Sequence, residues 1–97
     1  MRRAANRDKG EAAIIAALRK AGCSVLPLSM ADVPDLLVGV RGACFLLEVK
    51  APLGPRGGTS ADGQQLRAGQ VAWHRAWRGH VDVVRSPVEA LAAVGLA

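Results

Sequence analysis

Two apolar runs separated by a short turn constrain this chain more than any other feature. The runs cover residues 36–40 and 43–49, and both consist mainly of bulky apolar residues that favour strands. Runs of this kind joined by Arg41-Gly42 are typical of an antiparallel hairpin. Their hydrophobicity is nearly continuous, which predicts strands that are covered on both faces, as in the middle of a sheet.

Helical and strand-like patterns flank this hairpin on both sides. Amphipathic repeats mark the helices, and short apolar runs bounded by turn residues mark the strands. The predicted elements are a helix over 9–21, a strand over 23–28, the hairpin, a helix over 64–78, a strand over 80–85 and a helix over 87–94. This order, α-β-β-β-α-β-α, predicts an α/β fold with a mixed central sheet flanked by helices.

Capping residues set the expected ends of the first and last helices. Asp8 with Glu11, and Ser86 with Glu89, have the three-residue spacing of a capping box. The first helix is expected to stop at Gly22, because glycine readily adopts the left-handed conformation that ends helices.

The length of 97 residues fits a single domain, residues 1–97. Residues 1–7 are basic without periodicity and are expected to form an arm. Residues 51–63 are rich in Gly and Pro and predict a flexible loop, because too little chain follows to form a second core. No stretch approaches the roughly 18 apolar residues of a membrane span, and no secretion signal is present, so a cytoplasmic protein is expected.

The cysteines and the charge balance bear on compartment and partner. Cys23 and Cys44 lie in apolar runs without a nearby Cys or His, which favours buried thiols in a reducing compartment over zinc or a disulfide. Thirteen Lys and Arg against eight Asp and Glu give a net charge of +5, which favours nucleic acid as partner. An anionic membrane surface is less favoured, because the basic residues are spread along the chain and not gathered on one helix.

The hairpin register brings two carboxylates together. A two- or four-residue turn at Arg41-Gly42 places Asp35 opposite Glu48, with Cβ atoms about 4.5–5.5 Å apart. Lys50 follows two residues after Glu48 and therefore lies on the same face. Facing like charges in a largely buried hairpin are costly, and a divalent cation would neutralise them. Oxygen ligands of this kind suit magnesium or manganese.

Simpler interpretations of the same residues stay open. Pro34-Asp35 is a common turn pair, and Glu48 with Lys50 is also expected of an exposed ion pair at a fraying strand end. A three-residue turn would offset the two acids by one position, so the metal-site hypothesis depends on the loop length.

Pro34-Asp35, followed after twelve residues by Glu48-Val49-Lys50, resembles the signature of the PD-(D/E)xK nucleases. The similarity also takes in Glu11 on the first predicted helix and Gln70 on the second. In spacing and length the chain is most similar to the virus-type replication-repair nuclease (VRR-NUC) group, which includes small phage-encoded stand-alone enzymes. The resemblance implies a restriction-endonuclease-like α/β core and a metal-dependent DNA endonuclease.

The same resemblance implies roles for individual residues. Asp35 and Glu48 would bind Mg²⁺ or Mn²⁺ together with the carbonyl oxygen of Val49, and Lys50 would orient or deprotonate the attacking water. The products would carry 5′-phosphate and 3′-hydroxyl ends. Glu11 corresponds to an acid that approaches the metal directly or through water, but a helix cap explains this residue equally well.

Other residues of interest have two interpretations each. Gln70 corresponds to a glutamine near the nuclease site, and its alternative is an ordinary amide on a helix surface. Trp73 and Trp77 are expected in the core and not as base-stacking platforms, because of their helical spacing. His74 and His80 are expected at the surface or as capping residues. Arg56 with its neighbouring glycines is expected in a plain loop, with a phosphate-binding role as the alternative.

Two classes of function follow. The first is an endonuclease for branched DNA such as Holliday junctions, and the second is a non-catalytic DNA-binding module on a nuclease fold. The presence of Asp35, Glu48 and Lys50 together favours the enzyme. The small size of the chain favours a homodimer, in which the 51–63 loop could cross to the partner.

Overall fold

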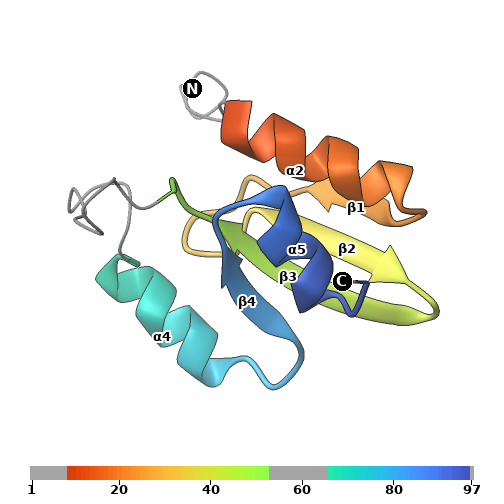
Figure 1. Ribbon diagram of the computed structural model, residues 1–97. Coiled ribbons are helices and arrows are strands. Elements are labelled where there is room, and N and C mark those ends of the chain that lie inside the picture. Colours follow the sequence, from red (N-terminus) through yellow and green to blue (C-terminus); the bar gives the residue numbers. More distant parts are fainter. Residues whose placement is uncertain (1–8, 53–65, 97) are drawn as a thin grey trace.

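The computed structural model describes residues 9–52 and 66–96, and its elements follow the predicted order (Figure 1). The elements are α2 (Lys9–Lys20), β1 (Ser24–Pro27), β2 (Leu36–Val40), β3 (Ala43–Val49), α4 (Ala68–Ala76), β4 (Val81–Val84) and α5 (Pro87–Ala93). The α/β fold is thereby confirmed. The predicted basic arm, Asp8, Arg56 and most of the predicted 51–63 loop lie outside the described residues.

The four strands form one mixed sheet in the order β1-β2-β3-β4. The pairs β1–β2 and β2–β3 are antiparallel, whereas β3–β4 is parallel. A parallel pair needs a long crossover connection, and α4 lies within the one between β3 and β4. The C-terminal ends of β3 and β4 therefore lie side by side.

The central hairpin has the predicted register. Its two turn residues both have positive φ, 54° at Arg41 and 80° at Gly42, as a two-residue type I′ turn requires. Leu37 pairs with Leu46, and the ladder ends with Leu36 opposite Leu47. A three-residue turn, which would have offset Asp35 from Glu48, is excluded.

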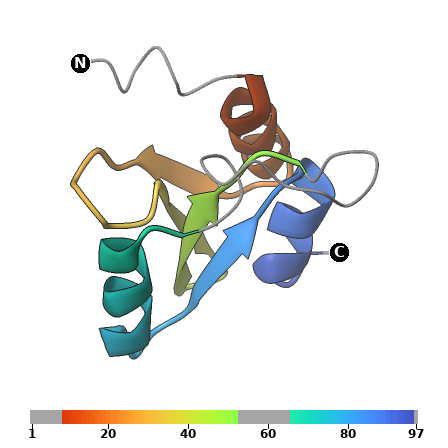
Figure 2. The same ribbon diagram turned by 90° about the vertical axis from the view of Figure 1, so that its left-hand side faces the viewer.

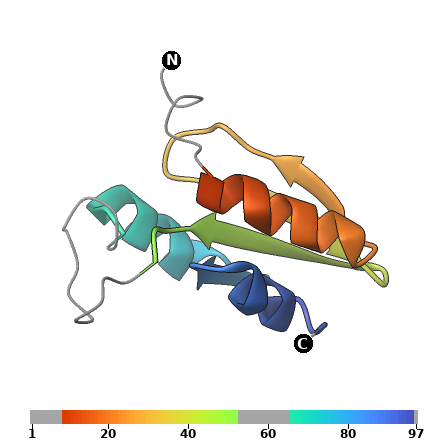
Figure 3. The ribbon, with the colours of Figure 1, turned by 45° about the horizontal axis from the view of Figure 1, so that its top comes forward.

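Two helices cover one face of the sheet and enclose the hydrophobic core. Helices α2 and α5 pack against each other and against this face (Figure 3). The core combines apolar residues of both helices with the strand residues that point toward them. Its buried members are Ile14, Leu18, Cys23, Leu36, Val38, Leu47, Val84, Ala90 and Val94.

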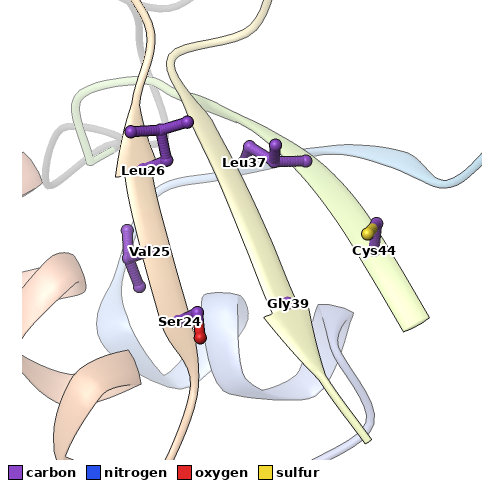
Figure 4. A pocket seen from close by; sticks show the side chains of 6 residues that line it. All are labelled: Ser24, Val25, Leu26, Leu37, Gly39 and Cys44. Atoms are coloured by element: carbon purple, nitrogen blue, oxygen red, sulfur yellow. The ribbon is translucent and has the colours of Figure 1, made fainter. Parts of the chain in front are cut away.

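Of the elements that the structure describes, only α4 lies on the opposite side of the sheet, so these elements cover that face only in part (Figure 2). Near the hairpin turn this face carries a groove of about 210 Å³, lined by side chains of β1, β2 and β3 (Figure 4). Leu26 in this groove is 56% exposed. The prediction of strands covered on both faces is therefore wrong at this end of the sheet.

The two cysteines lie in different surroundings. Cys23 is buried in the core, and burial raises the pKa of its thiol, partly offset by the charge of Arg41. Cys44 points toward the open groove and is exposed, so its predicted burial is wrong. Both are free thiols.

The C-terminal end of α2 and the N-terminal cap of α5 lie close to where their glycine and capping residues predicted them. Helix α2 ends one residue earlier than predicted and is followed by Gly22 at φ 99°, as a glycine stop requires. At α5, the Ser86 Oγ accepts a hydrogen bond from the Glu89 N–H at 3.1 Å, as predicted. The Glu89 carboxylate accepts from the N–H of Arg85 at 2.7 Å, one residue before the N-cap.

Helix α4 is shorter than the predicted 64–78. It begins at Ala68 after an extended Arg67, and it ends at Ala76 because Trp77 is already extended, with ψ 133°. Among the described residues, no helix is both long enough and apolar enough to span a membrane.

Candidate active site

The C-terminal end of β3 carries a buried ion pair. Glu48 is 2% exposed, and the Lys50 Nζ lies 3.7 Å from its Oε2 atom. Glu48 pairs with Val83 of β4, and the backbone N–H of Lys50 donates to the Val84 carbonyl at 3.0 Å. The strand end is therefore paired and covered, which excludes an exposed ion pair at a fraying strand end.

Asp35 lies beside this pair, immediately before β2. It is 8% exposed, and its Oδ2 accepts a hydrogen bond from the backbone N–H of Val49 at 2.8 Å. Its carbonyl accepts from the Leu28 N–H at 2.7 Å, which ties the turn before β2 to the end of β1. The structure thus brings Asp35 next to the Glu48-Val49-Lys50 segment, as the register predicted.

Gln70 joins the pair from α4. It is 4% exposed, and its Nε2 donates to the Glu48 Oε2 at 3.0 Å. Its Oε1 accepts from the Lys50 Nζ at 3.4 Å and from the Arg67 N–H at 2.9 Å. The interpretation of Gln70 as an ordinary surface amide is therefore wrong. The three bonds fix which end of the amide faces the carboxylate and which end faces the lysine.

The N-terminus of α4 is held by a contact that the sequence analysis missed. A Cβ atom on Gly69 would lie 2.5 Å from the Oδ2 of Asp32, so the carboxylate occupies space that only a glycine leaves. Asp32 itself has a positive φ of 67° in the loop between β1 and β2. The signal available in the sequence was Gly69 itself, because a glycine within a helix often marks a close approach.

Glu11 is buried in the first turn of α2, where the helix dipole stabilises a carboxylate. Within residues 9–52 and 66–96, no three His, Cys, Asp or Glu side chains gather closely enough to hold a metal among themselves. Glu11 therefore does not complete a group of three side chains with Asp35 and Glu48. Its role toward a metal, directly or through water, stays a prediction.

The donor set at the end of β3 nevertheless fits a small hard cation. Asp35 and Glu48 supply carboxylate oxygens, and the Val49 carbonyl belongs to the same segment. Magnesium keeps several of its waters and is commonly bound through only one or two carboxylates. Two carboxylates with a carbonyl therefore suffice for Mg²⁺ or Mn²⁺ in the manner that the resemblance implies.

His74 lies one helical turn after Gln70 and is half-buried. Burial lowers the pKa of its imidazole, and the nearby charge of Lys50 lowers it further. Its Nε2 is buried and has no hydrogen-bond partner among the residues that the structure describes. The expectation of a surface or capping histidine is wrong for His74. It holds for His80, which is exposed and stacks on Phe45 with ring centroids 4.5 Å apart.

Trp73 on α4 and Trp77 directly after this helix are not core residues. Trp77 is 43% exposed and Trp73 is half-buried, and neither belongs to the hydrophobic core. They stack on each other with ring centroids 4.9 Å apart and an interplanar angle of 17°. Their predicted placement in the core is wrong, because α4 is separate from the layer formed by α2 and α5 (Figure 1).

Comparisons of the chain with family models, with curated proteins and with solved structures found no match. The motif and the geometry at the end of β3 are therefore the features of this chain that bear on its function.

Proposed function

We propose that this chain is a divalent-metal-dependent DNA endonuclease that hydrolyses phosphodiester bonds. The observation that carries the proposal is the burial of Asp35 and Glu48 at one end of the sheet, with Lys50 and Gln70 both bound to Glu48. Burying carboxylates costs free energy unless another interaction compensates it, so such a cluster favours a functional role. The resemblance to the PD-(D/E)xK signature supports the same conclusion.

Each residue of the cluster has a role that follows from its position. Asp35, Glu48 and the Val49 carbonyl would hold Mg²⁺ or Mn²⁺. Such an ion supplies Lewis-acid stabilisation of charge on the phosphate and activates water at neutral pH. Lys50 places a positive charge beside the carboxylates, where it can stabilise the negative charge that develops on the phosphate and orient the attacking water.

Gln70 acts as a positioning residue in this proposal. Its amide nitrogen bonds the Glu48 carboxylate while its oxygen accepts from the Lys50 ammonium. One side chain thereby fixes the relative orientation of a ligand and of the charged residue beside it. Because α4 supplies Gln70, the placement of this helix controls the geometry of the site.

The proposed substrate is DNA with a branch, such as a four-way junction or a flap, cut by a homodimer. The net charge of +5 supports a polyanionic substrate. The groove beside Leu26 and Cys44 offers an apolar surface to a second copy of a small chain, which buries only about 60–65% of its unfolded surface on folding. A two-fold pair would present two sites of opposite strand polarity to one DNA.

A cleavage assay tests the proposal. Purified protein is incubated with linear, flapped and four-way-junction DNA in the presence of Mg²⁺, Mn²⁺ or EDTA. We expect cleavage with either metal, no cleavage with EDTA, and faster cleavage of the branched substrates. Glu48→Gln should be inactive, whereas Asp82→Asn, which changes an exposed carboxylate on β4, should be active.

The alternative is a DNA-binding module without catalysis. It predicts DNA binding without cleavage under every metal condition, and equal binding by the wild-type protein and Glu48→Gln. That pattern would contradict the endonuclease proposal.

A further inference from the structure

An exposed aromatic pair, Trp73 on α4 and Trp77 directly after this helix, lies close to the candidate active site. Trp73 and Trp77 stack with ring centroids 4.9 Å apart, and Trp77 keeps 43% of its surface exposed. A large aromatic residue that packs against a neighbour and still faces solvent is unusual in a chain that has only three aromatic residues in all. Core packing therefore does not explain the pair.

The backbone that follows α4 holds the outer ring in place. A Cβ atom on Gly79 would lie 2.8 Å from the Nε1 of Trp77 and 3.3 Å from its Cε2. The indole thus rests on the glycine backbone on one side and on Trp73 on another. A ring held in this way loses little conformational entropy when a flat ligand stacks on it.

Trp73 lies on the same helix as Gln70, which contacts the proposed metal ligand Glu48, and Trp77 directly follows this helix. Trp73 and Trp77 follow Gln70 by one and two helical turns. At a rise of about 1.5 Å per residue, Trp77 lies roughly 10 Å along the helix from Gln70. At a spacing of about 3.4 Å per nucleotide along a stacked strand, this distance corresponds to about three nucleotides.

Basic residues lie close in sequence to the exposed ring. Arg75 and Arg78 flank it in sequence, and both are exposed. Arg67 is exposed at the opposite end of the same helix. Aromatic rings interspersed with basic side chains form the surfaces on which unpaired nucleotides bind, with stacking on the bases and charge on the phosphates.

We propose that the Trp73–Trp77 pair is a stacking platform for an unpaired base of the DNA substrate, about three nucleotides from the bond that is cut. This inference rests on the proposed function for its substrate, and it explains a preference for branched DNA. A branch point or a flap exposes bases that a continuous duplex keeps stacked, so the free-energy cost of unstacking is lower there.

Intrinsic fluorescence measures the stacking directly, because Trp73 and Trp77 are the only tryptophans of the chain. The variant Trp73→Phe leaves Trp77 as the single indole. Titration with oligothymidine in EDTA, where no cleavage occurs, should quench this fluorescence, and a blunt duplex should quench it much less. Equal quenching by both DNAs, or none by oligothymidine, would overturn the inference.

Affinity measurements with point variants separate stacking from charge. Trp77→Ala should weaken binding of oligothymidine about tenfold and leave blunt-duplex binding unchanged, whereas Trp77→Phe should retain most of the affinity. As matched control, Arg75→Gln should weaken binding of both DNAs alike, because it removes a phosphate contact. Equal losses for both DNAs in Trp77→Ala, or a Phe variant as weak as the Ala variant, would refute the platform.

A second copy of the chain is the competing occupant of this surface. If the fluorescence of Trp77 changed with protein concentration in the absence of DNA, the pair would be a dimer contact and the inference would fall. Quenching without any cleavage would leave the platform standing and refute the endonuclease. If the wild type cleaved DNA and Trp77→Ala bound oligothymidine as tightly as the wild type, the endonuclease proposal would stand and the platform would be refuted.

Discussion

The two ends of one sheet face have opposite relations to solvent. At the end next to α4, the charged and polar residues Asp35, Glu48 and Gln70 are at most 8% exposed. At the hairpin end, Leu26 is 56% exposed and Cys44 faces an open groove. Both ends are built on β2 and β3, so the strands themselves do not cause the difference. The position of α4 does, because this helix covers only one end.

The two ends both depart from the usual arrangement, in which polar groups face water and apolar groups are buried. Each departure costs stability, because buried carboxylates lose hydration and a leucine that is 56% exposed gains only part of the hydrophobic free energy of burial. Costs of this kind are commonly retained where they serve a function. We call the end next to α4 the covered end and the hairpin end the open end. We expect the covered end to act on a ligand and the open end to bind a macromolecule.

Removing a carboxylate at the covered end should have the largest effect on activity and little on stability. We expect Asp35→Asn and Glu48→Gln to reduce cleavage roughly a thousandfold or more, since a metal ligand is lost. The fold should be as stable or more stable, because both amides can still accept hydrogen bonds and one of two neighbouring charges is gone. Cleavage rates and urea midpoints from one preparation measure both effects.

The control for these variants is Asp82→Asn, which alters an exposed carboxylate on the neighbouring strand. It should match the wild type in both assays. Wild-type cleavage by Glu48→Gln would refute the metal site, and unfolding of the variant would assign the cluster a structural role.

The sequence predicted the hairpin and the positions of its charged residues better than it predicted the placement of α4. The hairpin register was predictable because two turn residues with positive φ allow one pairing, and that pairing places Asp35 beside Glu48. The position of Lys50 on the same face as Glu48 was predictable because side chains alternate between the two faces of a strand. These are local relations within fifteen or so residues of chain, for which turn chemistry and periodicity suffice.

The errors share one cause, which is the placement of α4. The start of this helix depends on the bond from the Arg67 N–H to Gln70, and its docking depends on the contact of Asp32 with Gly69. The first is a local capping contact between residues three apart, and the second is a tertiary contact that no periodic pattern encodes. The misplaced burial of Cys44 and Trp77 follows, because a pattern of apolar residues does not say which stretch of a sheet a helix will cover.

Gln70→Ala should weaken the covered end itself. The substitution removes three hydrogen bonds and deprives Glu48 and Lys50 of a shared partner. We expect a loss of about 1–3 kcal/mol in the free energy of unfolding, together with slower cleavage. Urea unfolding measures the first and the cleavage assay the second. Arg75→Ala on the exposed side of α4 is the control for stability and should lie within about 0.5 kcal/mol of the wild type.

If Gln70→Ala cost no stability, the hydrogen bonds between α4 and β3 would contribute nothing to holding the helix in place. The account of the covered end as a cluster fixed by Gln70 would then be wrong.

The stability of the covered end should also depend on pH through His74. Burial and the charge of Lys50 lower the pKa of His74 below its ordinary value of 6.5, so the unfolded chain takes up this proton more readily than the folded one. The contribution of His74 is therefore complete above about pH 6.5 and is lost as the pH falls below it. Urea midpoints measured on both sides of pH 6.5 should decrease toward acid.

His74→Gln removes this titration and should flatten the decrease over the same pH range. The variant His80→Gln alters an exposed histidine and should keep the wild-type slope. The same acid dependence in wild type and His74→Gln would contradict the assignment.

The open end should show the smallest effect on stability and a clear effect on assembly. Leu26 is more than half exposed on the edge strand β1, so Leu26→Asp should change the free energy of unfolding by no more than about 0.5 kcal/mol. If the groove is the surface that a second copy covers, the charge would be buried in the dimer without a partner and would dissociate it. Sedimentation equilibrium at micromolar protein should then show a dimer for the wild type and a monomer for the variant. A variant that stays dimeric would remove the groove from the interface, and a wild type that is monomeric while cutting both strands of a junction in concert would show that the open end serves no second copy.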